Sequence, residues 1–183
     1  LILGAALVVL FLAGALDLCV GTSEVSLSGL LSAFSEGPNA QSIEGAILWQ
    51  LRLPMTLTAM FVGTSLGLAG LQIQNITQNP LASPSTLGIT SAASFGAALS
   101  ISLGLTALGH LWIATAANAL IFALVVSFAI YFLSVKRSMT PETVILAGIV
   151  VNFFFLALQQ VLIYRSSPEV AQIINGWTFG NLE

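Results

Sequence analysis

Charge is what this sequence lacks most. Only 6% of its residues are Asp, Glu, Lys or Arg, and none of these occurs in the 83 residues from Leu53 to Val135. The surface of a soluble domain needs charged side chains in contact with water, so this is not an ordinary soluble protein. A bilayer removes that requirement, and the uncharged stretch is long enough for three helices of about 20 residues each. The sequence therefore predicts an all-α, polytopic transmembrane helical bundle.

Cysteine and histidine are nearly absent as well. Cys19 is the one cysteine, so no disulfide forms within the chain, and His110 is the one histidine, with no cysteine or second histidine near it. Zinc sites need several such ligands at short spacings. We therefore expect no metal site and no cofactor in this chain.

The few basic residues exclude two further classes of function. Four lysines and arginines form no basic face, so no nucleic-acid partner is expected. The only lysine, Lys136, follows no glycine-rich phosphate loop, so we expect no ATP site. There is no His-Glu-x-x-His pair, and His110 lies outside the expected spans, so we expect the chain not to be an enzyme.

Apolar residues make up 57% of the chain, and the mean hydropathy is +1.01. The first segment lacks a basic start and has no small residues just before Cys19, which favours a retained span over a removed signal peptide. Since the first residue is Leu1, we expect both ends to be cut. About five spans are expected. Four have the ranges Leu1–Leu16, Pro54–Thr77, Thr86–Leu105 and Leu111–Leu133, and the fifth starts after Pro141-Glu142 and runs to about Tyr164.

Two segments between and after these spans are expected to lie outside the bilayer core. Gly21–Gln50 is polar, but apolar residues recur in it at helical spacing, which predicts a short helix on the membrane interface. Val170–Phe179 is mixed and short, which predicts a partial helix outside the bilayer. Pro54 suits the first turn of the helix that follows it, where its missing N–H costs nothing. The apolar residues of the interfacial helix are Leu27, Leu30, Leu31 and Phe34.

Small residues at intervals of four mark two of the expected spans. Such spacing lets helix backbones approach closely, which is the main packing device in lipid. We expect both spans to pack in this way. The residues are Ala59, Gly63 and Gly67 in one span, and Ala92, Gly96, Ser100 and Gly104 in the next.

The orientation follows from the pair Lys136-Arg137. Short cytoplasmic turns are enriched in basic residues, and this pair lies in the turn between the last two expected spans. We therefore expect that turn to be cytoplasmic, and Gly21–Gln50 and Arg165–Glu183 to be outside.

A polar segment, Gln72–Pro84, interrupts the uncharged stretch. If the helix continued through it, three of its amides would lie on one face, and they would face protein or water because lipid offers them no partner. Hydrogen bonding between helices and the lining of a solute path are both open interpretations. Asn79-Pro80 and Ser83-Pro84 are expected to break the helix. The amides are Asn75, Gln78 and Asn79, with Gln74 close to that face.

Several blocks of sequence resemble the permease subunits of bacterial importers for iron chelates, haem and vitamin B12. The resemblance covers essentially all 183 residues in the same order. Members of that family are about twice as long, typically with ten spans, so the chain resembles their first half, a truncated single permease domain over residues 1–183. The matching blocks are Leu51–Pro54, Gln78–Pro84, Leu87–Ile89, Leu146–Ile149 and Gly176–Gly180.

The resemblance implies a permease of the ATP-binding-cassette class in a bacterial plasma membrane. Its partners would be a second permease subunit, two separate ATPase subunits that bind ATP, and an extracytoplasmic solute-binding protein. An iron-siderophore is the expected solute, with haem or cobalamin as alternatives.

The resemblance also implies roles for particular residues. Arg52 matches an outer arginine that docks the binding protein, with an interfacial anchor as the alternative role. Asn79 and Leu81 match a cytoplasmic gate loop. The other gate position is occupied by Thr140, Pro141 and Glu142, where relatives carry small hydroxyl residues.

Two amides are expected along the translocation path, Gln78 and Asn152. Asn152 is the only strongly polar residue of its span before Gln159, and a helix–helix hydrogen bond is the alternative for it. Half of a secondary transporter or channel is the other functional class that fits a polytopic chain. Such proteins often carry a carboxylate at the midplane, which this sequence lacks.

Overall fold

The computed structural model describes residues 2–19, 27–38, 42–107 and 109–180, and it confirms the all-α class. The regular elements among these residues are all helices, and the one strand-like pairing is an isolated bridge between Ala107 and His110. The chain forms two compact units, one mainly from Leu1–Leu66 and one from Gly67–Asn181. Helix α4 (Leu53–Thr77) belongs partly to each.

The first unit contains α1 (Ile2–Cys19), α2 (Leu27–Glu36), the short α3 (Ile43–Ala46), the π-helical η1 (Ile47–Arg52) and the first part of α4. The buried side chains of Ala33 and Leu48 join α2 to η1. The indole nitrogen of Trp49 donates to the carbonyl oxygen of Ala33 at 3.0 Å, and its ring lies 5.5 Å from that of Phe34.

The expected interfacial helix is therefore present as α2. Ala33 is buried against η1, whereas Leu31 and Phe34 are exposed. The side chains of Leu27 and Leu30 lie outside the described residues, as do residues 20–26 and 39–41 of the segment around this helix. Its place on the membrane interface stays a prediction.

The expectation that Pro54 opens a helix is wrong, because helical backbone already runs from Ile43 to Thr77. A proline inside a helix removes one hydrogen bond and clashes with the carbonyl four residues earlier. The turn before Pro54 is π-helical, and the N–H of Leu53 bonds the carbonyl of Leu48, five residues back. The wider turn of a π-bulge accommodates the proline without ending the helix.

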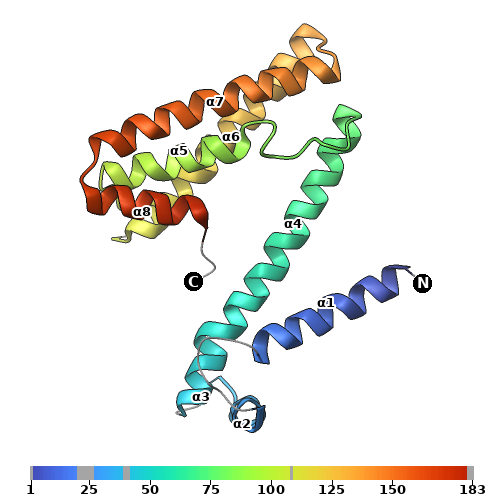
Figure 1. Cartoon of the computed structure of the whole chain (residues 1–183), viewed down its shortest axis with the longest axis vertical. Coiled ribbons are helices and arrows are strands. Elements are labelled where there is room, and N and C mark those ends of the chain that lie inside the picture. Colours follow the sequence, from blue (N-terminus) through green and yellow to red (C-terminus); the bar gives the residue numbers. More distant parts are fainter. Residues whose placement is uncertain (1, 20–26, 39–41, 108, 181–183) are drawn as a thin grey trace. The chain divides into compact units, whose positions relative to one another are not determined.

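The second unit contains the end of α4 with α5 (Ile89–Ser102), α6 (Leu111–Arg137), α7 (Pro141–Arg165) and α8 (Pro168–Phe179). Figure 1 shows α5, α6 and α7 lying side by side, with α8 against α5. Close packing of α5 on α6 depends on Gly96, because a Cβ there would lie 2.6 Å from the carbonyl oxygen of Asn118. Ala92 and Ser100 on the same face are buried, so the predicted small-residue packing is confirmed for these three residues, whereas Gly104 lies beyond the end of α5 with open space around it.

The same packing is absent from α4 within the described chain. A Cβ on Gly63 or Gly67 would meet nothing within 4 Å among the described residues. At Ala59 the same face borders α1 across a small pocket, so the open space is at Gly63 and Gly67.

Within the described ranges, three helices are long and apolar enough to cross a membrane. They are the continuous helix Ile43–Thr77, with 35 residues, α6, with 27, and α7, with 25. The predicted span Thr86–Leu105 is shortened to the 14 residues of α5. At about 1.5 Å per residue α5 is about 21 Å long, short of a hydrocarbon core of about 30 Å.

The limits of α5 have local causes. The chain before it forms turns up to Gly88, and Gly104 after it has a φ of 62°. Helices α7 and α8 begin at Pro141 and Pro168, slightly earlier than predicted. Thr140 and Ser167 are their N-caps, and each is followed by a proline at the first helical position.

Candidate functional site

Helix α4 ends at Thr77, as predicted for this span, so the helix does not continue through Asn79. Gln78 has a φ of 49°, in the left-handed region, and the N–H of Asn79 bonds the carbonyl of Gln74 at 3.2 Å. A left-handed residue is a common way for a helix to end, and Pro80 prevents its resumption. Asn75, Gln78 and Asn79 therefore do not share one helical face.

The amides of this segment bond their own neighbourhood. Gln74 Nε2 donates to the carbonyl of Pro80 at 2.9 Å, and Gln78 Nε2 donates to that of Asn75 at 2.7 Å. Asn79 Oδ1 accepts from the N–H of Leu81 at 2.9 Å, which is an Asx-turn. The amides thus satisfy backbone groups that the broken helix leaves free. Contacts to another helix were one of the two interpretations of these side chains, and none of these three bonds is such a contact.

The loop that follows is held by a reciprocal pair, Ser83 and Thr86. The Thr86 hydroxyl accepts from the N–H of Ser83 at 2.9 Å and donates to the carbonyl of Ser83 at 2.7 Å. Leu81, just before this turn, is 83% exposed, whereas Ala82 is buried. The segment Ser83–Gly88 is called the seated turn below, because its far end rests on α7.

That contact joins Gly88 to α7. Gly88 has a φ of 74°, and a Cβ on it would lie 2.8 Å from the backbone nitrogen of Asn152 and 3.0 Å from the carbonyl oxygen of Gly148. A Cβ on Gly148 would in turn lie 2.6 Å from the Cα of Leu87 and 2.6 Å from the carbonyl oxygen of Thr86. Backbone therefore packs on backbone, which only glycine permits at both positions.

The second predicted gate segment begins α7. The Thr140 hydroxyl oxygen accepts from the N–H of Thr143 at 3.5 Å and lies 3.1 Å from the Thr143 hydroxyl. Pro141 occupies the first helical position, and the exposed carboxylate of Glu142 follows in the first turn. Negative charge is favourable at a helix N-terminus. These three residues thus form a helix start immediately after Ser138, whose φ of 46° turns the chain out of α6.

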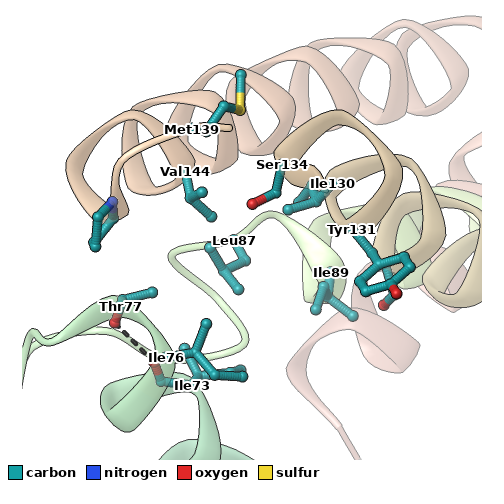
Figure 2. A pocket seen from close by; sticks show the side chains of 12 residues that line it. Ile73, Ile76, Thr77, Leu87, Ile89, Ile130, Tyr131, Ser134, Met139 and Val144 are labelled. Carbon is teal, nitrogen blue, oxygen red and sulfur yellow. Dashed lines mark hydrogen bonds between the residues drawn. The ribbon is translucent and has the colours of Figure 1, made fainter. Parts of the chain in front are cut away.

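A pocket of about 370 Å³ lies between the end of α4, the seated turn, α6 and the start of α7. Figure 2 shows Leu87 pointing into it between Val144 and Ile73. Pro141 is the predicted gate residue that lines the pocket, and Asn79, Leu81, Thr140 and Glu142 lie outside its lining. The walls come from the end of α4 (Ile73, Ile76, Thr77), the start of α5 with its preceding turn (Leu87, Ile89), α6 (Ser127, Ile130, Tyr131, Ser134), and the turn into α7 (Met139, Pro141, Val144).

The pocket is chemically apolar. Two of its hydroxyl groups already bond their own helices, Thr77 to the carbonyl of Ile73 at 2.7 Å and Ser127 to that of Ala123 at 2.8 Å. No group of three or more His, Cys, Asp or Glu side chains able to hold a metal ion occurs among the described residues. The pocket is therefore an apolar cavity, with Leu87 forming part of its wall.

Of the two predicted path residues, Asn152 lies near this site and Gln78 is turned to the surface. The backbone nitrogen of Asn152 is the atom nearest to a Cβ built on Gly88, and its side chain is half-buried. Gln78 is exposed at the left-handed end of α4. Neither arrangement tests a role in translocation, which stays a prediction for both.

Arg52 lies in the first unit and differs from the exposed charge that was expected. It is only 8% exposed, and its Nη1 donates to the carbonyl of Leu18 at 2.6 Å, in the last turn of α1. One turn further along, the Thr56 hydroxyl donates to Asp17 Oδ2 at 2.5 Å. A cation at a helix C-terminus satisfies free carbonyls and complements the helix dipole. Arg52 thus joins α1 to the helix before Pro54, and its docking role stays a prediction.

Sequence reasoning missed one buried polar contact. Gln159 is 3% exposed, and its Nε2 donates to the Thr178 hydroxyl at 2.9 Å, joining α7 to α8. The amide oxygen of Gln159 has no hydrogen-bond partner in the described structure. Its position near the end of an apolar span was the available signal, because a buried amide in lipid needs a partner.

The chain is thus a multi-pass membrane protein, in which a span is broken beside an apolar pocket. It belongs to the FecCD transport family, whose sequence profile matches residues 7–183. With this family the chain is placed in the plasma membrane.

Relatives support this assignment along most of the chain. The ferric enterobactin transport system permease protein of Escherichia coli K12 is 32% identical over 97% of this chain and 52% of its own length. The iron(3+)-hydroxamate import system permease protein of Bacillus subtilis 168 is 31% identical over 100% of this chain and 46% of its own. The vitamin B12 import system permease protein of Shigella boydii is 31% identical over 94% and 49%.

A solved structure agrees with these relatives. The inward-facing structure of a transporter assigned to the metal-chelate ABC type matches with a TM-score of 0.73 and 27% identity, over 99% of this chain and 52% of that one. The chain spans about half the length of the relatives it matches.

Proposed function

We propose that the chain is the first half of the permease subunit of an ABC importer, and that it carries an iron chelate across the membrane. Membership of the FecCD transport family supports the class of protein. The observation that supports a transport site here is the pocket, whose walls include the end of α4, the seated turn and the start of α7. Irregular backbone within a membrane is tolerated only where protein or a water-filled cavity surrounds it, and this break lies beside the pocket.

Iron-siderophore is the solute that we propose. Two of the relatives are named for ferric enterobactin and iron(3+)-hydroxamate, and one for vitamin B12. Haem and cobalamin remain the alternatives within the same class. In this proposal the solute comes from an extracytoplasmic binding protein, which selects it, and the permease moves it.

ATP is proposed to act on separate subunits. The chain contributes no phosphate-binding loop before Lys136. Two ATPase subunits and a second permease subunit are therefore proposed as partners. Half of a secondary transporter is disfavoured by the absence of Asp, Glu, Lys and Arg from Leu53 to Val135, since ion coupling commonly uses a carboxylate at the midplane.

The test is uptake by the full-length permease, reconstituted in proteoliposomes with its ATPase and a binding protein encoded beside it. We expect ATP-dependent accumulation of a ferric siderophore, lost when the ATPase carries a substitution of its phosphate-loop lysine. Haem and cobalamin are measured in parallel. Accumulation of cobalamin alone would correct the solute, and uptake that persists without ATPase subunits would reject the class.

A further inference from the structure

The loop between α4 and α5, residues 78–88, is held by different helices at its two ends. At its far end, Leu87 and Gly88 rest on α7, and a Cβ on Gly148 would meet backbone atoms of Thr86 and Leu87 at 2.6 Å. Backbone atoms cannot step aside as the tip of a flexible side chain can. Any displacement of α7 near Gly148 therefore displaces the seated turn with it.

The seated turn is also rigid in itself. Thr86 and Ser83 exchange hydrogen bonds, and the N–H groups of Gly88 and Ile89 bond the carbonyls of Ser85 and Pro84 at 3.1 and 3.2 Å. These bonds cross the turn internally, so it transmits a movement without unfolding.

The near end of the segment has a different character. The bonds described above between Gln74 and Pro80 and between Asn79 and Leu81 are local, and they tie this stretch to the end of α4. Gln78 has left-handed backbone and Leu81 is 83% exposed. The hydrogen bonds of the four residues Gln78–Leu81, called the pivot below, run to the end of α4 or within the loop, so they do not fix the angle between α4 and the seated turn.

The body that holds the seated turn extends beyond α7. Phe95 on α5 lies 5.2 Å from Phe122 on α6 and 5.5 Å from Phe155 on α7, measured between ring centroids. Gly96 adds the backbone contact between α5 and α6. Aromatic rings and close backbone packing make these three helices one body, and the pocket separates this body from the end of α4.

We propose that Gly148 is a positioning residue of the gate. Because Gly148 has no side chain, Leu87 and Gly88 pack directly on the backbone of α7. The seated turn therefore moves with α7 as one body, while the chain bends at the pivot. Bending there changes the distance between Ile73 and Leu87 across the pocket, which opens or closes it. This inference rests on the proposed transport function for its meaning, whereas the contact itself does not depend on it.

Distances between spin labels test the proposal in the full-length transporter with its ATPase subunits, in a Cys19→Ser background. One label pair joins the seated turn to α7, at Ser85→Cys and Val161→Cys. The other joins α4 to α7, at Leu71→Cys and Val161→Cys. All three side chains are exposed, and none lines the pocket. The distances are measured by electron–electron double resonance without nucleotide and with ATP and vanadate.

We expect the distance between Ser85 and Val161 to stay unchanged between the two states, and that between Leu71 and Val161 to shift by several ångströms. An equal shift in both pairs would overturn the proposal, because the turn would then move independently of α7. No shift in either pair would also overturn it, because the pivot would then not be used.

A second comparison needs no ATPase and no transport. Gly148→Ala should shift and broaden the distance distribution between Ser85 and Val161 in the nucleotide-free protein. Gly176→Ala is the matched control, because Gly176 is also helical and a Cβ there meets nothing within 4 Å. If Gly148→Ala left the distance distribution unchanged, the proposed packing of the seated turn on Gly148 would be rejected, even if the protein transported its solute. Failure to bind any ATPase, with the seating confirmed, would count against the proposed function alone.

Discussion

A Cβ on Gly148 would lie 2.6 Å from the Cα of Leu87, so α7 and the turn before α5 meet backbone to backbone. Gly88 completes the contact from the other side, with a Cβ position 3.0 Å from the Gly148 carbonyl oxygen. This contact holds one wall of the pocket in place, because Leu87 and Val144 both line it.

The first prediction concerns the stability of this contact. Gly148→Ala and Gly176→Ala each gain up to about 1 kcal/mol of helix preference, so their difference isolates the clash at Gly148. Overpacking of this kind costs about 1–3 kcal/mol. We expect Gly148→Ala to melt at a lower temperature than Gly176→Ala in the detergent-solubilised full-length protein. Equal melting temperatures would mean that the turn shifts to accommodate the new methyl group without loss of stability, and would contradict the prediction.

Gly88→Ala should be more harmful than Gly148→Ala. The new Cβ meets the backbone nitrogen of Asn152 at 2.8 Å, and the φ of 74° is itself unfavourable for alanine by about 1–2 kcal/mol. Gly37→Ala is the control for the φ contribution, because Gly37 has a φ of 79° and open space around it. The melting temperature of Gly88→Ala should be lower than that of Gly148→Ala. Gly37→Ala should lose only the stability that corresponds to the unfavourable φ.

The third prediction concerns Gln159 and Thr178, which join α7 to α8. Thr178→Val leaves the buried amide of Gln159 with neither of its polar atoms bonded, which costs about 1–3 kcal/mol. Gln159→Leu removes the amide together with its unsatisfied oxygen and should cost less. We therefore expect Thr178→Val to be the more destabilising of the two and to speed amide hydrogen exchange in α8.

The double variant checks this reasoning. In the Gln159→Leu background, Thr178→Val leaves no buried amide without a hydrogen-bond partner. The double variant should therefore be about as stable as Gln159→Leu. Gln160→Leu changes the exposed neighbour and should leave exchange in α8 unaltered. Additive losses in the double variant would show that the hydrogen bond is not what couples the two sites.

Much of the fold could be predicted from the sequence, because it depends on local composition. The uncharged stretch predicted the membrane class, and the polar residues around Pro141 and Pro168 predicted the starts of α7 and α8 to within about two residues. The break after Thr77 was also predicted, from Asn79-Pro80. These signals act within a few residues of the structure that they determine.

The errors arose where distant parts of the chain decide the structure. Pro54 was expected to begin a helix, but a π-helical turn before it lets the helix run through, which no local rule indicated. Arg52 was expected to be exposed, but the C-terminal carbonyl of Leu18 holds it. The contact of Gly88 with Gly148 joins two sequence blocks that had been matched separately, and their meeting is a tertiary fact.

The fourth prediction concerns topology. A cysteine in place of Ser138, in the turn after Lys136-Arg137, should react with a membrane-impermeant maleimide only from the cytoplasmic side. A cysteine in place of Glu169, in the first turn of α8, should react only from outside. Both are read in spheroplasts and in inverted vesicles of the Cys19→Ser background. Labelling of Ser138→Cys from outside would invert the orientation and move the pocket to the other side of the membrane.

The last prediction separates two roles of Arg52. Its guanidinium joins the end of α1 to the helix before Pro54, so Arg52→Gln should destabilise the first unit. If Arg52 also docks the binding protein, the same change should weaken capture of loaded binding protein, with the largest loss at low salt, because ions screen the attraction between charges on two proteins. Thr56→Val is the matched control, since it removes the neighbouring bond to Asp17 without changing any charge.

The two variants are compared by docking affinity and by melting temperature in the same preparation. A docking role predicts that Arg52→Gln loses affinity beyond the loss of Thr56→Val, and that the difference disappears as salt is raised. A purely structural role predicts equal affinities at every salt concentration once the melting temperatures are matched. Arg52→Lys decides between charge and geometry, because it keeps the charge and gives up the planar fork of donors that reaches the Leu18 carbonyl. If Arg52→Lys keeps its docking affinity but melts at a lower temperature, the positive charge serves docking and the planar guanidinium serves the stability of the fold.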